Sequence, residues 1–132
     1  MEKRMRYGVM IVLALVVMIT GACASGQVRV GFVGSQSGNQ MNFTFSRFDG
    51  VERKTLQLSE GTQLVLDYAI ELEEGSIEIE VIDPDGEISW ESSITAAEEA
   101  SAVILVEKGG MYQICVKGED ARGGFGLRWE LD

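Results

Sequence analysis

Apolar and polar residues alternate along most of the chain from Met41 to Leu131, and this alternation constrains the fold more than any other feature. The segment TQLVLDYAIEL (62–72) carries five apolar side chains on one face, and SIEIEVI (76–82) carries three. A period of two is typical of antiparallel strands with one face in a core and the other in water. Turn signals separate almost every pair of predicted strands. The sequence therefore predicts an all-β fold, an antiparallel β-sandwich of seven or eight short strands.

The dipeptide Asp49-Gly50 separates two alternating segments, MNFTFSRF (41–48) and VERKTLQL (51–58). Asp-Gly accepts the positive φ angles of a type I′ turn, which joins the strands of tight β-hairpins. We therefore predict a hairpin in which Arg47 lies opposite Glu52 as an exposed cross-strand pair.

Other segments predict turns and further strands. DPDG (83–86) has proline at the second position of a turn, and EISWES (87–92) is a short strand at or near an edge. TAAEEA (95–100) favours a loop over a helical turn. AVILV (102–106) is apolar on both faces, which predicts a central strand.

The N-terminus has the features of a secretory signal. Three basic residues precede eleven uninterrupted apolar residues, Val9 to Ile19, and small residues follow. As a helix, eleven residues cover about 16 Å, roughly half of a bilayer core. Residues 1–22 are therefore predicted to be a signal peptide that forms a helix. An uncleaved membrane anchor over residues 7–24 is the alternative.

The stretch ITGACAS, which ends the apolar segment, resembles a bacterial lipobox because Gly21 and Ala22 stand directly before Cys23. Thr20 departs from the pattern, which usually has Leu, Val or Ile there. The resemblance implies cleavage between Ala22 and Cys23, and diacylglyceryl and acyl chains such as palmitate on Cys23. Two or more acyl chains anchor a protein firmly to a membrane. We therefore expect an extracytoplasmic protein, lipid-anchored to a bacterial membrane, with a tether over residues 23–40 and a sandwich domain over 41–132. A short strand within VRVGFV (28–33) is the alternative for that part of the tether.

The charge balance excludes some partners. Without residues 1–22 the basic residues fall from 11 to 8 and the acidic residues from 21 to 20, which leaves a net charge of −12. Binding to nucleic acid or to anionic lipid needs basic patches, so neither is expected. There is no histidine, and Cys115 is the only thiol besides Cys23. Without a base to activate that thiol, the sequence predicts no catalytic residue and no enzyme.

Residues 56–131 resemble known β-sandwich domains. The block LDYAIELEEGSIEIEVIDPDGEISWESS (66–93), with the later GGMYQICVKG (109–118), is similar to GOLD domains, to bacterial pre-peptidase C-terminal domains and to small bacterial lipoproteins. GOLD domains serve protein–protein contacts. They also pair the cysteine of the Tyr-x-x-Cys strand with a second cysteine, and the sequence offers no such partner for Cys115. Since Tyr112 and Cys115 are three residues apart, they point to opposite faces, which excludes an immunoglobulin disulfide framework.

Two small groups are candidate binding residues. Asp83, Asp85 and Glu87 alternate around a turn and form a weak Ca²⁺ candidate, although a plain turn is favoured. Trp90 stands in a short strand, where an aromatic side chain stacks on sugars or anchors a protein partner, with core packing as the alternative. No other cofactor or metal is expected. We predict a binding or accessory module of the bacterial cell envelope, with an envelope protein or a glycan as partner; the alternative is a structural or envelope-stress lipoprotein without a specific ligand.

Overall fold

A computed structural model describes residues 27–132, so the predicted signal peptide and Cys23 lie outside the described residues. The described chain forms seven strands in one antiparallel system: β1 (Val28–Val30), β2 (Val33–Ser37), β3 (Gln40–Leu58), β4 (Gln63–Ile82), β5 (Ile88–Ile94), β6 (Glu98–Leu105) and β7 (Gly110–Leu131). These residues contain no helix of the length and hydropathy that a membrane crossing requires.

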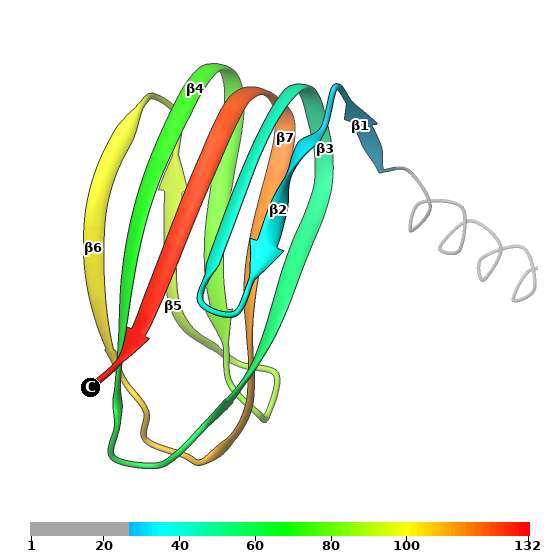
Figure 1. The fold of residues 1–132 in the computed structure, drawn as a ribbon. Coiled ribbons are helices and arrows are strands. Elements are labelled where there is room, and N and C mark those ends of the chain that lie inside the picture. The colour runs from blue at the N-terminus through cyan, green and yellow to red at the C-terminus, as the bar shows by residue number, and fades with distance from the viewer. Residues whose placement is uncertain (1–26) are drawn as a thin grey trace, which may run out of the picture.

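Three strands are long and bent, and each contributes to both layers. β3, β4 and β7 have 19, 20 and 22 residues. Figure 1 shows them arching over at one end of the molecule and running down both layers. We call this the bend end. Register shifts mark the bends, between Leu72 and Ser76 in β4 and between Phe45 and Gly50 in β3.

The strand pairings define the two layers. In the five-stranded layer, the order is β2, the first part of β3, the last part of β7, the first part of β4, and β6. In the four-stranded layer, the order is the last part of β3, the first part of β7, the last part of β4, and β5. The short β1 pairs with residues 47–49 beside the bend in β3. This arrangement confirms the antiparallel β-sandwich.

The core lies between the layers and is filled by the apolar positions of the alternating pattern. Leu64, Leu66 and Ile70 from one layer and Ile79 and Ile114 from the other are at most 3% exposed. Aromatic rings close the core near the bend of β3, where Phe32 stacks on Phe43 at 4.7 Å between centroids; Phe45, Phe48 and Phe125 complete the cluster. The polar positions of the same strands are thereby left on the two outer faces.

The predicted hairpin at Asp49-Gly50 is wrong. Residues 40–58 form one strand, which pairs with β7 along both of its halves. Asp49 accepts a hydrogen bond from the backbone N–H of Asp120 at 2.6 Å, which ties the bend of β3 to that of β7. The predicted Arg47–Glu52 pair is absent: Arg47 contacts Asp49 at 3.0 Å, and Glu52 pairs with Arg29 at 2.6 Å.

The predicted tether and central strand also need correction. Residues 28–30 and 33–37, placed in a tether over 23–40, pair with β3 and belong to the sandwich. The segment 102–106 was predicted to be a central strand, but β6 is an edge strand that pairs only with β4 among the described residues. Its outward side chains Val103 and Leu105 are 63% and 57% exposed. The turn at 83–86 is confirmed, since the Gly86 N–H donates to the Asp83 carbonyl at 3.0 Å.

Candidate functional site

A groove runs across the outer face of the five-stranded layer. Its floor is made by the outward positions Gly124 and Gly126 of β7 and Ala69 of β4, and Ala69 lies directly opposite Gly126. Side chains on the flanking strands rise on both sides because they belong to the same outward set. The sheet's alternation thus produces a channel wherever the central strands carry no side chain larger than a methyl group.

Two adjoining cavities of about 530 and 420 Å³ make up this groove. They share Asn42, Ala69 and Gly126, so the channel is continuous over β2, β3, β7, β4 and β6. Phe125, Trp129, Phe45 and Tyr68 of these strands belong to the core and are at most 7% exposed, and Phe43 is half-buried against it. The groove therefore presents polar side chains on its walls and a floor of glycine and alanine.

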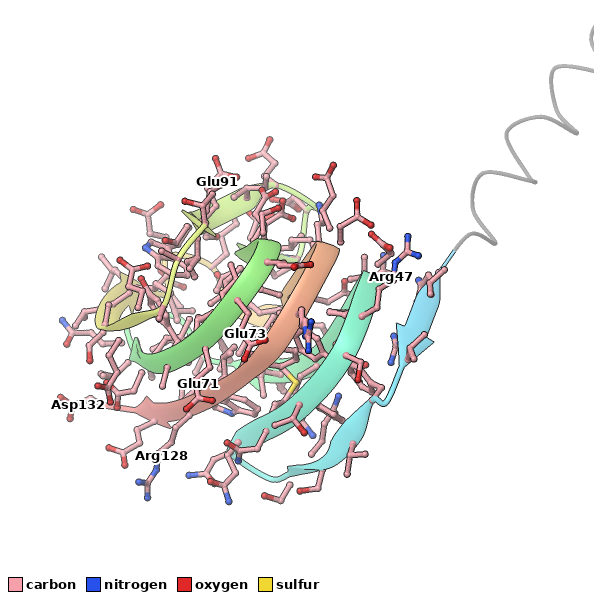
Figure 2. The ribbon with its side chains drawn as sticks, turned by 90° about the horizontal axis from the view of Figure 1, so that it is seen from above. Arg47, Glu71, Glu73, Glu91, Arg128 and Asp132 are labelled. Carbon is pink, nitrogen blue, oxygen red and sulfur yellow. The ribbon has the colours of Figure 1, made fainter. Side chains whose placement is uncertain are left out.

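The groove is lined by side chains with mixed hydrogen-bonding capacity. Gln40, Asn42 and Thr44 of β3 form one side. Asp67 and Glu71 of β4 and Glu99 and Ser101 of β6 form the other, and Arg128 projects at one end. Figure 2 shows Glu71 and Arg128 on the same side of the molecule, with Glu91 on the opposite side. Carboxylates, amides, a hydroxyl and a guanidinium together can both donate and accept hydrogen bonds.

The two floor glycines have different structural roles. A Cβ at Gly124 would lie 2.8 Å from the carbonyl oxygen of Phe43, so the close approach of β3 and β7 requires glycine there. A Cβ at Gly126 would meet only the side-chain oxygen of Asn42 at 2.8 Å. Since that side chain can move, the fold does not require glycine at position 126. Glycine there keeps the floor of the groove open.

The outer face of the four-stranded layer carries charges that bind one another. Glu80 is the only buried charged residue among those described, and its carboxylate accepts a hydrogen bond from Lys117 Nζ at 2.9 Å. This bond lowers the pKa of Glu80 and raises the pKa of Lys117. The carboxyl oxygens of Glu78, Glu80 and Glu91 lie within 4.8 Å of one another, and the hydrogen bond with Glu80 raises the pKa of Glu78. Three carboxylates could hold a cation, but the Lys117 ammonium already supplies a positive charge to Glu80.

Cys115 lies on this same face, opposite Glu80 of β4 and Arg53 of β3. Its side chain points away from the core that Ile114 and Val116 enter, yet it is only 1% exposed. Burial raises the pKa of the thiol, which keeps it protonated near neutral pH. The absence of catalytic function stays a prediction.

Trp90, Asp83 and Glu87, all singled out from the sequence, line one cavity of about 460 Å³ at the open edge between β5 and β6. Trp90 is half-buried, packs on the core and lies 5.9 Å from the Tyr68 ring. Trp90 therefore packs on the core and also lines the cavity, and its role in binding stays a prediction.

The carboxylates of the 83–87 turn, predicted as a weak Ca²⁺ site, already have partners. Asp83 Oδ1 accepts backbone N–H bonds from Asp85 and Glu87, both at 2.9 Å, which shape the turn. Lys108 Nζ pairs with Asp85 and lies 3.8 Å from Asp83. The Lys108 ammonium thus lies where a cation would bind, and the weak Ca²⁺ site stays a prediction.

The groove was not predicted from the sequence because its residues come from five strands, most of which lie far apart along the chain. On each strand taken alone, these residues resemble those of an ordinary solvent-exposed face. One signal was present: in GGFGLRW (123–129), glycine stands at the outward positions where a solvated strand normally carries polar side chains.

No protein-family model matches this sequence, and no curated protein matches it significantly. Solved structures share its fold at low identity. One described as "CBM4 structure and function" has a TM-score of 0.52 and 11% identity over 83% of this chain and 79% of its own. TmCBM61 in complex with β-1,4-galactotriose has a TM-score of 0.47 and 16% identity over 76% and 69%. A carbohydrate-binding module from Cellvibrio mixtus lichenase 5A in complex with cellotriose has 0.44 and 15% over 80% and 87%. The likeness to the CBM4 structure agrees with the β-sandwich fold.

Proposed function

We propose that the protein is a lipid-anchored, extracytoplasmic binding module of the bacterial envelope, and that the groove on its five-stranded face binds a glycan. The observation that carries the proposal is the continuous channel over Gly124, Gly126 and Ala69, with polar side chains along both of its walls. An open channel of this kind accepts an extended chain without closing around it.

The chemistry of the walls favours a glycan over a peptide. A peptide bound by strand addition needs an unpaired sheet edge, and the floor strands β4 and β7 are paired on both sides. Sugar hydroxyls both donate and accept hydrogen bonds, which fits a wall that offers carboxylates, amides and a guanidinium. The shared fold of the CBM4 structure, whose family name denotes carbohydrate binding, supports the same assignment.

The proposed anchor would place the sandwich close to the membrane. Only four residues, 24–27, separate Cys23 from the start of β1 at Val28, so the two Cα atoms can lie at most about 18 Å apart when the chain is fully extended. Because β1 pairs beside the bend of β3, a lipid on Cys23 would hold the bend end nearest the membrane. The groove would then lie on a side face, open to the surrounding envelope.

Mass spectrometry of the mature N-terminus tests the anchor, with wild type compared with Cys23→Ala. We expect the mature chain to begin at lipid-modified Cys23, and the variant to lose both the lipid and its membrane fraction. An intact N-terminus beginning at Met1 would instead make residues 7–24 a plain membrane anchor and contradict the lipoprotein assignment.

The groove is tested by filling its floor with Gly126→Leu and measuring trisaccharide binding by the full-length chain in non-ionic detergent. Trimers of glucose, N-acetylglucosamine and glucosamine serve as probes. We expect at least one trimer to bind, and the variant to weaken that binding at least about tenfold, which is 1.4 kcal/mol. Ser93→Leu places the same side chain on the exposed four-stranded face and should leave binding unchanged. Failure of all three trimers to bind wild type would contradict the glycan proposal.

A further inference from the structure

Three carboxylates follow one another along one side of the groove. Asp67 and Glu71 are outward residues of β4, and Glu99 of β6 lies opposite Ala69, midway between them. Each is therefore a diagonal neighbour of the next, about 7–8 Å away across the strand pair. All three side chains are exposed, and all three line the two cavities of the groove.

The protein supplies little positive charge to these carboxylates. None of the three forms an ion pair with another residue of the described chain, 27–132. Asp67 has partial compensation, because Ser101 donates a hydrogen bond to it and Arg128 is its cross-strand neighbour. Glu71 faces Gly124 and Glu99 faces Ala69, neither of which carries a polar side chain.

Among residues 27–132, Arg128 is the only cationic residue that lines either cavity of the groove. Against three carboxylates, it leaves the channel with an excess of negative charge, and the whole chain carries a formal charge of −10. Since solvent-exposed charges repel like charges over about a Debye length, uronic or sulfated glycans would be disfavoured in this channel. The same field attracts a cationic ligand.

From this charge pattern, and resting on the glycan function proposed above, we propose that the groove selects glycans with free, protonated amino groups. An ammonium group has three donors and no acceptor, which matches carboxylates that accept only. Glu71 and Glu99 are the residues that would bind the amino group, because they lie farther along the channel from Arg128 than Asp67 does. With the aromatic residues turned into the core, charge and hydrogen bonds replace stacking as the source of selectivity.

Titration of full-length protein in detergent with trimers of glucosamine, N-acetylglucosamine and glucose tests this selectivity. At low salt and mildly acidic pH, where the amino sugars are protonated, we expect the glucosamine trimer to bind about tenfold more tightly than the other two. Each exposed ion pair contributes only modestly to the free energy of binding, so several are needed for a tenfold preference. Because salt screens exposed charges, the preference should shrink as salt is added. Trilysine is included to test for a basic peptide as the ligand.

The outcomes separate the two proposals. Equal binding of the three trimers would overturn the amino-sugar selectivity and leave the glycan function standing. If no trimer binds, both proposals fail, and trilysine binding alone would identify a basic peptide as the ligand class.

Three variants assign the selectivity to residues. Glu71→Gln with Glu99→Gln should abolish the preference for the glucosamine trimer while keeping the shape of the channel. Arg128→Gln should raise affinity for that trimer a few-fold, since it removes a like charge. Glu60→Gln, which removes an exposed carboxylate from a turn outside the groove, is the matched control and should change nothing. A loss of preference in the control equal to that in the double variant would assign the effect to net charge and overturn the site.

Discussion

The two outer faces of this sandwich are built from the same three long strands, yet they use charge in opposite ways. On the four-stranded face, Glu80 is 4% exposed and is hydrogen-bonded to Lys117. On the five-stranded face, Glu71 and Glu99 are exposed and have no ion-pair partner in the described chain. Glycines of the adjoining strand β7 open the floor of the groove beside them. Charges that bind one another stabilise the fold, whereas charges left without partners around a channel remain available to a ligand.

The largest expected effect concerns the bends that create the two faces. At Gly75 of β4, φ is +77°, and a Cβ would overlap the backbone of Asp120. Gly61 has a φ of +86° with open space around it. Gly75→Ala should therefore cost at least about 3 kcal/mol of unfolding free energy and Gly61→Ala about 1 kcal/mol, because only the first adds a backbone clash to the positive φ. Urea denaturation measures both, and equal losses would show that the bend has no special packing requirement.

A smaller effect is expected on the four-stranded face. Lys117→Met removes the partner of a buried carboxylate, so the free energy of unfolding at pH 7 should fall by about 1–2 kcal/mol. The matched control is Arg122→Met, whose partner Glu73 lies 3.2 Å away with both side chains more than half exposed. Its effect should stay within about 0.5 kcal/mol. Equal effects of the two substitutions would remove the distinction between a buried and an exposed pair.

The pH dependence of the Lys117→Met effect has a definite sign. The pKa of Glu80 is lowered in the folded protein, so its contribution is present above the unfolded pKa of about 4.3 and is lost as pH falls through the folded value. The pKa of Lys117 is raised, so its contribution is present below about 10.4 and is lost as pH rises through the folded value. The variant and wild type should therefore differ most between about pH 5 and pH 10 and converge in acid. A constant difference down to pH 2 would contradict the ion-pair explanation.

The smallest stability effect is expected in the groove. Glu71→Gln and Glu99→Gln remove carboxylates that form no ion pair within the described part of the chain, so the free energy of unfolding should change by less than about 0.5 kcal/mol. Glu80→Gln, the same change on the other face, should destabilise by about 1–2 kcal/mol, because the Lys117 hydrogen bond loses its charge. Thermal denaturation of the three variants compares the faces directly. A large loss at Glu71 or Glu99 would show that the groove carboxylates have a structural role.

Sequence patterns predicted the strands well and their connections less well. Alternation identified the inward faces of β4 and β7 because side-chain period is a local property. Asp49-Gly50 was interpreted as a hairpin turn, since Asp-Gly suits both a turn and an irregular bend. The contact with β7 decides in favour of the bend. The backbone N–H of Asp120, 71 residues from Asp49 along the chain, donates a hydrogen bond to the Asp49 carboxylate. A partner so distant leaves no local signal.

The candidate site was less predictable than the fold. Trp90 was singled out because aromatic residues are individually conspicuous, whereas the groove depends on register between strands. Gly126 faces Ala69 and Asn42 only because β7 pairs with β4 and β3 at those positions. The segment 102–106 shows the same limit: its apolar outward residues predicted burial, but β6 has no second neighbour among the described strands.

The central claim, that the five-stranded face is the ligand-binding face, is tested most directly by backbone amide NMR of the full-length chain titrated with the glucosamine trimer. The account predicts shift changes concentrated at the amides of Ala69, Gly124 and Gly126, with those of Glu80 and Cys115 unchanged. Changes concentrated instead at Trp90 and the edge between β5 and β6, or on the four-stranded face, would contradict it.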